Sequence, residues 1–369
     1  MSRRRIGGIL LCLVIAGGIA AGGPEKHKIL VISSYHRAYL WSQDTQAGLC
    51  QGLLEFGFLE EEQQAAVFTA TDRVESRRAV IKKLWMDTKR KHEKKDIVAS
   101  MTEIMAEIAQ FAPDVVLLGD DNAANYIGNQ LIDTDTPVVF WGVNGRPLKY
   151  GLLDSLERPG HNVTGVYQAG YLEECLAFLK RIVPNVRTMA ILSDDSPTGR
   201  AKAKQVQRLL RRRDEPIDLV GTVITNSYTE WKQKALDLEA QVDAFFILNH
   251  NSLQDGAGNP VDQLTAGAWY LRNIQKPECA HERQFVEEGM LSVCDDSGFN
   301  QGYEAAKLAH RILVKGEDPG LIAVRAPKRG PFIVNRQRAR MLGIDLTDQM
   351  GIEQTVPTAL ALKADVENR

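Results

Sequence analysis

The sequence predicts an α/β fold in which two lobes, each built on a doubly wound parallel sheet, follow one another along the chain. Short, continuously apolar segments alternate with longer segments of helical periodicity, which is typical of parallel strands covered by helices on both faces. This alternation is interrupted between residues 144 and 161 and then starts again. The length of 369 residues, with 44% hydrophobic and 25% charged residues, suits two or three globular domains with well-filled cores.

The first half of the chain carries the first set of alternating elements. Residues 28–33 (KILVIS) and 137–141 (PVVFW) are apolar runs of strand length, and the segments between such runs have the length and period of helices. We predict strands at 28–33, 66–71, 114–118 and 137–141, and helices at 44–56, 75–95, 97–111 and 122–131.

The second half repeats this organisation without repeating the sequence. We predict strands at 163–167, 188–192, 218–223 and 244–248, and helices at 172–183, 199–213, 228–240 and 261–273. The last third is mixed, with a short strand within 288–293, an apolar helix at 302–315 that stops at Gly316, a strand at 332–335 and a helix at 337–342. The segment from residue 345 onward has weak periodicity, and we expect it to fray.

The N-terminus has the order of a secretory signal peptide. Arg3–Arg5 precede an apolar run at 6–19 and a small-residue segment at 18–23. The apolar run is shorter than the roughly 20 residues that span a membrane. We therefore expect residues 1–23 to be removed and the protein to be exported; the alternative is an uncleaved N-terminal anchor.

Charge and cysteine usage narrow the class of protein further. The chain has 45 Lys and Arg against 47 Asp and Glu, a net charge of −2, so no basic excess favours a nucleic-acid partner. Cys279 and Cys294 are close enough in sequence to form a disulfide in an oxidising compartment, or else all four cysteines after residue 23 are buried thiols. The sequence has no Cys-x-x-Cys or His-Glu-x-x-His spacing, so we expect neither a metal nor a cofactor.

Polar and aromatic residues gather where the predicted strands end, and ligands of open α/β sheets bind at that edge. Pairs of aspartates follow three strands, at 120–121, 194–195 and 295–296, and five aromatic residues stand in or near such loops: Tyr35, Tyr39, Trp41, Trp141 and Tyr228. Carboxylates beside ring faces suit a ligand with an ammonium group and a planar body, and an amino acid fits this description. Asp and Ser are also preferred helix N-caps, so each aspartate has a capping interpretation as well.

Catalytic interpretations have weaker support. Ser34, His36 and Asp44 could be combined into a triad, but no Gly-x-Ser-x-Gly turn accompanies them. The strand-to-helix turns also lack the glycine patterns that hold dinucleotides and phosphates. We expect no catalytic residues and a binding role, with a secreted enzyme as the remaining alternative.

Four motifs, taken in order, resemble the ABC-transporter substrate-binding family that includes tryptophan- and tyrosine-type binding proteins. Residues 158–166 (RPGHNVTGV) are similar to its R-P-G-x-N-V-T-G-V signature, and residues 302–319 to its G-Y-x-x-A-A-x-x-A-x-x-I-L-x-G-x-x-P helix. Residues 332–344 resemble its F-x-x-N…L-G-I element. Residues 33–42 resemble an S-Y-H…W-[ST] form that also occurs in sensor ectodomains of signalling kinases.

The resemblance implies a type I periplasmic binding protein, with two lobes joined by a three-strand hinge. The implied organisation is 24–144 plus 281–322 for lobe 1, 145–280 plus 323–350 for lobe 2, and 351–369 as a C-terminal tail. The ligand-contacting positions of the family correspond here to Ser34, Tyr35, Asp121, Asn122, Asn144, Asp194, Asn249 and Asp295. The loop after Gly119 departs from the usual small residues, so the identity of the ligand does not transfer.

The resemblance also implies partners and a location. We expect a periplasmic monomer that binds a small molecule, an amino acid and an aromatic one among the candidates, and delivers it to an ABC permease in the membrane. The alternative partner is a membrane histidine kinase, for which the protein would serve as a ligand sensor.

Overall fold

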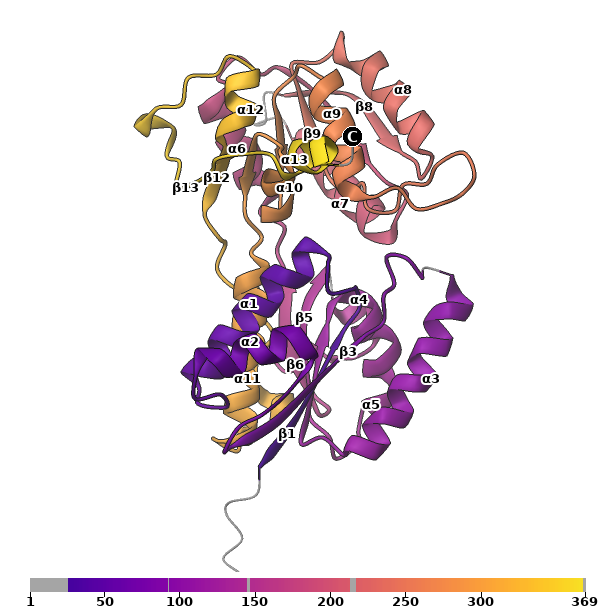
Figure 1. Cartoon of the computed structure of the whole chain (residues 1–369), viewed down its shortest axis with the longest axis vertical. Coiled ribbons are helices and arrows are strands. Elements are labelled where there is room, and N and C mark those ends of the chain that lie inside the picture. Colours follow the sequence, from indigo (N-terminus) through magenta and orange to yellow (C-terminus); the bar gives the residue numbers. More distant parts are fainter. Residues whose placement is uncertain (1–25, 92, 145–146, 213–216, 368–369) are drawn as a thin grey trace, which may run out of the picture.

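The computed structural model describes residues 26–367 except 92, 145–146 and 213–216, and these residues form two α/β lobes arranged along the long axis of the molecule (Figure 1). The predicted signal peptide, residues 1–23, lies outside the described residues. Within the described part of the chain, no helix is long and apolar enough to cross a membrane.

The first lobe is built on a six-stranded sheet that is parallel except at one edge. Its order is β2-β3-β1-β4-β5-β6, and only β2 and β3 pair antiparallel. The strands are β1 (His27–Ser33), β2 (Arg73–Glu75), β3 (Ala79–Trp85), β4 (Val115–Gly119), β5 (Val138–Asn144) and β6 (Val163–Gln168).

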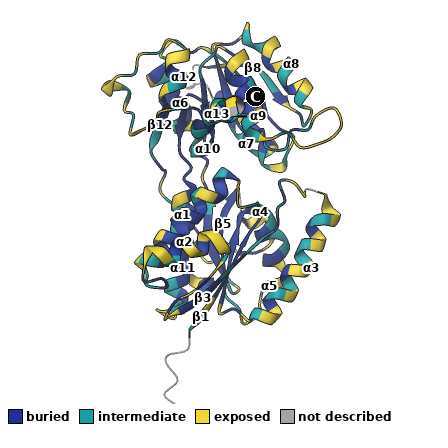
Figure 2. Cartoon of the chain, in the orientation of Figure 1, coloured by how far each residue is buried: buried dark blue, intermediate teal, exposed yellow. Residues whose placement is uncertain are grey.

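Helices cover both faces of this sheet because successive residues of its strands point to opposite sides. Ile29 and Val31 of β1 pack under α1 (Leu40–Glu55), α2 (Glu62–Thr71) and α11 (Gly298–Leu313). Leu30 and Ile32 face the other layer. That layer consists of α3 (Lys94–Phe111), α4 (Asp120–Asn122), the π-helical turn η1 (Ala123–Gly128) and α5 (Asn129–Leu131). The buried strands lie between partly exposed helices (Figure 2).

The second lobe repeats the three-layer arrangement on a seven-stranded sheet of order β13-β12-β11-β10-β9-β7-β8, in which only β11 and β12 pair antiparallel. The strands are β7 (Thr188–Ser193), β8 (Asp218–Ile224), β9 (Ala244–Ile247), β10 (Glu278–Ala280), β11 (Ser292–Cys294), β12 (Phe332–Asn335) and β13 (Gln354–Val356). The helices are α6 (Leu172–Ile182), α7 (Pro197–Leu210), α8 (Tyr228–Glu239), α9 (Gln263–Asn273), α10 (Arg283–Glu288), α12 (Arg336–Met341) and α13 (Leu360–Glu367).

The chain passes between the lobes three times, after β6, after β11 and before β12 (Figure 1). The boundaries differ from those expected after residues 144 and 280. Residues 163–168 belong to the first sheet because β6 pairs with β5, whereas β11 pairs with β10 and β12 in the second sheet. Arg325 still bridges to Val166 of the first sheet.

Two predictions for the chain segments at the β2–β3 edge of the first sheet are wrong. The predicted strand 66–71 is part of helix α2, which begins where the Gln64 side chain accepts hydrogen bonds from two backbone amides, and it buries Ala65 and Phe68 three residues apart. The predicted helix 75–95 contains strand β3 instead. Its inward positions are 79, 81 and 83, and a lysine at position 83 hid the strand alternation.

The C-terminal tail, predicted to fray, is part of the second lobe. β13 extends the sheet beside β12, and α13 packs against α9, where Ala361 approaches Gly267. Both contacts are with segments outside the tail, and Ala361 and Gly267 are 94 residues apart, so local periodicity does not reveal them.

Close packing of α1 on α11 explains one of the sequence motifs. A Cβ atom at Gly302 would lie 2.0 Å from the Thr45 carbonyl oxygen, and one at Gly48 would lie 1.8 Å from that of Phe299. Both positions therefore require glycine, and the Gly-Tyr motif at 302 marks this helix contact.

Cys50, Cys175, Cys279 and Cys294 are free, buried thiols in the structure. Cys279 and Cys294 lie on neighbouring strands, but Cys279 pairs in register with Ser292. The structure therefore corresponds to the unbridged alternative.

Lys83 of β3 is a buried lysine that ion-pairs with no carboxylate among the described residues. Its ammonium donates to Gln46 Oε1 at 2.6 Å and lies 4.0 Å from the centroid of the Trp85 ring. Burial lowers the pKa of Lys83 from 10.5 to about 7. The unfolded chain therefore binds more protons than the native one between these two values, and we expect the free energy of unfolding to rise with pH from about 7 to 10.5.

Urea unfolding at pH 7 and pH 9 tests this expectation. The substitution Lys83→Met should flatten the rise, whereas Lys204→Met, which removes an exposed lysine, should preserve it. Equal pH dependence in the wild type and the Lys83→Met variant would contradict the assignment.

Candidate functional site

A cleft of about 500 Å³ lies between the two lobes, at the carboxyl ends of strands from both sheets. The first lobe contributes Tyr35, Asp121 and Asn122, which follow β1 and β4, and Asn144, the last residue of β5. The second lobe contributes loops after β7, β8 and β9, at Asp195–Thr198, Asn226 and Asn251. We call this space the outer cleft.

A much smaller space, of about 10 Å³, continues inward from the outer cleft and shares Tyr35, Lys89, Asn144 and Thr198 with it. We call it the inner chamber. Its lining includes the aromatic and charged residues Tyr35, Tyr39, Trp41, Lys89, Asp120 and Glu282. The inner chamber therefore combines three aromatic rings with two buried carboxyl groups and one ammonium.

Asp120 is held in place by backbone and side-chain constraints. It follows β4 directly with a φ of 69°, a left-handed conformation that Asp tolerates better than most residues. Its Oδ1 accepts a 2.7 Å hydrogen bond from Trp41 Nε1, and a Cβ at Gly142 would lie 2.4 Å from the same atom. Burial raises the pKa of Asp120 well above its usual range, and the indole hydrogen bond only partly opposes this.

Glu282 supplies the second carboxyl group, from the turn between β10 and α10. Burial raises the pKa of Glu282, but the interactions with its neighbours, His281 first and then Lys202 and Lys89, outweigh burial and bring its pKa below the ordinary value. His281 Nε2 lies 3.3 Å from Glu282 Oε1, and Gln284 Nε2 donates to Oε2 at 2.6 Å. The inner chamber therefore holds one carboxyl group that favours the proton and one that favours the charge.

Asp121 lies in the outer cleft, but the protein itself engages its oxygens. Its Oδ1 accepts from Tyr150 Oη at 2.5 Å and Lys149 Nζ at 3.1 Å, and its Oδ2 accepts from the Asn144 backbone and side-chain amides. Burial, followed by Asp121, raises the pKa of the Tyr150 hydroxyl. Asp121 thus fixes the position of Asn144 at the rim of the cleft.

Tyr39 links the two lobes beneath the outer cleft. Its hydroxyl accepts hydrogen bonds from Asn251 Nδ2 at 2.8 Å and Gln284 Nε2 at 3.3 Å, both from the second lobe. Its ring meets that of Tyr35 edge-on, with centroids 5.2 Å apart.

The structure brings six of the eleven sequence-predicted residues to the outer cleft or the inner chamber: Tyr35, Trp41, Asp121, Asn122, Asn144 and Asn249. The other five, Ser34, Trp141, Asp194, Tyr228 and Asp295, do not line either space.

Each of these five has a structural partner elsewhere. Ser34 Oγ bridges the Gly119 carbonyl and the Ala123 amide, and Trp141 packs in the core against Gly119. Asp194 accepts from the Ser196 hydroxyl and the Ser252 amide, and Ser196, not Asp194, is the N-cap of α7. Tyr228 packs under the Lys232 ammonium at the start of α8, and Asp295 accepts from the Arg283 amide near a lobe crossing.

The sequence analysis missed four residues of the inner chamber: Lys89, Gln168, Thr198 and Glu282. Two of them, Lys89 and Glu282, carry charge. Lys89 follows β3, which was hidden within a predicted helix, and Glu282 follows β10, a three-residue strand that was not predicted. Recognising these two strands would have placed both residues in the strand-end loops.

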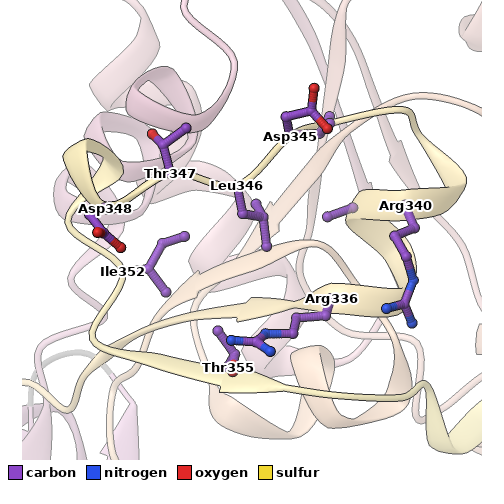
Figure 3. A pocket seen from close by; sticks show the side chains of 10 residues that line it. Arg336, Arg340, Asp345, Leu346, Thr347, Asp348, Ile352 and Thr355 are labelled. Atoms are coloured by element: carbon purple, nitrogen blue, oxygen red, sulfur yellow. The ribbon is translucent and has the colours of Figure 1, made fainter.

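A second cavity, of about 420 Å³, lies at the opposite end of lobe 2, between α12 and residues 344–355 (Figure 3). Its charged lining, Arg336, Arg340, Asp345 and Asp348, is spread around an open hollow without an aromatic ring. The space between the lobes is therefore the better candidate site. Within the described residues, no three His, Cys, Asp or Glu side chains are grouped as a metal ion would require.

Comparison with known proteins identifies the family and the fold of the chain. Residues 76–355 match the family model of the ABC transporter substrate binding protein. The chain belongs to this family. A tyrosine-binding protein from Clostridioides difficile (strain R20291) is 22% identical to this substrate-binding protein over 209 residues, which are 56% of this chain and 57% of the relative. The chain thus matches little more than half the length of that relative.

Solved structures of substrate-binding proteins share the fold. An ABC domain from Streptococcus pneumoniae in complex with L-Trp matches 90% of this chain and 100% of its own, with 19% identity and a TM-score of 0.67. A ligand-free, open substrate-binding protein with adhesive properties from Clostridium difficile matches 90% and 99%, with 19% identity and a TM-score of 0.65. The fold is that of type I periplasmic binding proteins, and the family consists of solute-binding proteins, not enzymes.

Proposed function

We propose that this protein is the extracytoplasmic solute-binding component of an ABC importer and that it binds a small amine-bearing solute between its lobes. The observation that carries this proposal is the inner chamber, where the carboxyl groups of Asp120 and Glu282 stand beside the rings of Tyr35, Tyr39 and Trp41. An ammonium group gains from carboxylates and from ring faces, and a planar body gains from the same rings. An aromatic amino acid combines these features.

The relatives support this choice of ligand. One is named a tyrosine-binding protein, and another is solved with L-Trp. The three crossings between the lobes would allow a hinge motion that closes the cleft over the solute. We further propose that residues 1–23 direct export to the periplasm and that the protein acts as a monomer.

The alternative is a sensor that docks on a membrane histidine kinase. The complex of the TorS sensor domain with TorT matches 90% of this chain and 99% of its own, with 12% identity and a TM-score of 0.51. That likeness concerns the fold alone, so transport remains our proposal. Co-purification with a permease or with a kinase ectodomain would distinguish the two.

A thermal-shift screen tests the proposed ligand class. Binding to the native state at 100 times Kd adds about 2.7 kcal/mol to the free energy of unfolding, so L-tyrosine or L-tryptophan should raise the melting temperature by several degrees. The matched acids without an amino group should produce a smaller shift. If no amino acid at millimolar concentration raises the melting temperature, the proposal that the ligand is an amino acid is wrong. Native mass spectrometry of freshly purified protein would give the mass of a bound solute directly.

A further inference from the structure

The Lys89 ammonium lies in the inner chamber without a hydrogen-bond or ion-pair partner among the described residues. It stands 4.7 Å from the centroid of the Tyr35 ring and 5.2 Å from that of Tyr39. A cation at such distances from ring faces is attracted by their electron density, and this attraction replaces the missing hydrogen bonds only in part.

The two carboxyl groups of the inner chamber also act on this ammonium. The charge of Lys89 contributes to lowering the pKa of both Asp120 and Glu282, although burial dominates in the first and is the largest opposing effect in the second. The nitrogen therefore stands in a field created by two tyrosine rings and two carboxyl groups, while it forms a close ion pair with neither carboxyl.

We propose that the Lys89 ammonium occupies the place that the ligand's ammonium group takes, so that an amine-bearing solute binds by displacing the Lys89 side chain. This inference rests on the proposed function. An alkylammonium and the α-ammonium of an amino acid carry the same charge and the same three donors, so surroundings that hold one also hold the other.

The size of the inner chamber argues against both groups being present at once. Its free volume of about 10 Å³ is no more than the roughly 10–15 Å³ that a single water needs in a cavity, so it leaves no room for a second ammonium group beside that of Lys89. Lys89 lines the outer cleft as well. The side chain can therefore withdraw into the outer cleft when the ligand enters. Lys89 thus competes with the solute for the same place, and this competition lowers the affinity of the protein for the solute.

The opposite role is that Lys89 remains in place and pairs with the ligand's carboxylate. The two roles predict effects of opposite sign when the charge is removed. Displacement predicts that Lys89→Met tightens the binding of any ligand that carries an amine, whether or not it carries a carboxylate. Pairing predicts that the same change weakens only ligands with a carboxylate.

Isothermal titration calorimetry on the full chain can separate these roles. The probes are L-tyrosine, tyramine, which lacks the carboxylate, and 3-(4-hydroxyphenyl)propionate, which lacks the amine. The variants are Lys89→Met, Lys89→Arg, which keeps the charge, and Lys91→Met, which removes an exposed charge from the same segment. Thermal unfolding of each variant verifies that it is folded.

We expect Lys89→Met to tighten L-tyrosine and tyramine about tenfold, which equals about 1.4 kcal/mol. Lys89→Arg and Lys91→Met should stay within about twofold of the wild type. If Lys89→Met binds L-tyrosine more weakly and tyramine with unchanged affinity, the inference is overturned in favour of pairing. If its affinity for both ligands is unchanged, the inference is overturned outright. If neither the wild type nor Lys89→Met binds an amine, the proposed function fails; binding by Lys89→Met alone supports both proposals.

Discussion

Replacement of Arg338 by methionine is expected to lower the free energy of unfolding by about 3–5 kcal/mol. Arg338 is fully buried on α12, and its guanidinium donates to both oxygens of Glu278 at 3.0 Å. It also donates to the carbonyl groups of residues 271, 274 and 276, which lie at the end of α9 and in the loop before β10. Its removal leaves a buried carboxylate and three carbonyl groups without this donor.

Urea unfolding followed by far-ultraviolet circular dichroism measures this loss. Arg340→Met on the same helix provides the matched control, because Arg340 is exposed; its effect should stay within about 0.5 kcal/mol. In the double variant with Glu278→Gln, part of the stability should return, since no unpaired charge then remains buried. Equal stability of the Arg338→Met and Arg340→Met variants would show that the buried pair does not hold α12 on the lobe.

The sequence predicted the architecture well where strands are continuously apolar. β1, β4 and β5 are such strands, and their carboxyl ends carry Tyr35, Asp121 and Asn144, which the structure places in the outer cleft. The prediction failed at β3 because Lys83 occupies an inward position. A hydrophobicity pattern assigns a lysine to the surface, so the alternation of the strand was not recognised. That error also removed Lys89 from the candidate site.

The predicted site was limited by contacts between distant segments. Asp120 and Asp194 have the same local context, the first of two aspartates after an apolar strand. Asp194 accepts hydrogen bonds from its own turn and from Ser252, whereas Asp120 turns its carboxyl group towards Trp41 and the inner chamber. The partners that decide between these two outcomes lie 58 and 79 residues away, beyond the reach of local motifs.

Asp120→Asn is expected to weaken the binding of L-tyrosine or L-tryptophan about 100-fold. The amide still offers an oxygen to Trp41 Nε1, so the fold of the loop is retained, but it cannot carry the negative charge that pairs with an ammonium group. Loss of one partner of a buried charge pair costs about 2–5 kcal/mol, and about 2.7 kcal/mol corresponds to 100-fold. Asp195→Asn provides the control, since Asp195 lines the outer cleft as an exposed carboxylate paired with Arg200.

The pH dependence of binding tests the role of Asp120 more specifically than the loss of affinity does. Because burial raises its pKa well above the usual range, Asp120 favours the protonated form before the ligand binds. An incoming ammonium favours the ionised form, so binding should release a proton and the affinity should rise with pH until the unliganded protein has lost that proton. Calorimetry between pH 6 and pH 8.5 in two buffers of different ionisation enthalpy measures the release directly. Asp120→Asn should abolish this release and Asp195→Asn should preserve it. Proton release that persists in Asp120→Asn would assign the titrating group, and with it the ammonium contact, to another residue of the inner chamber.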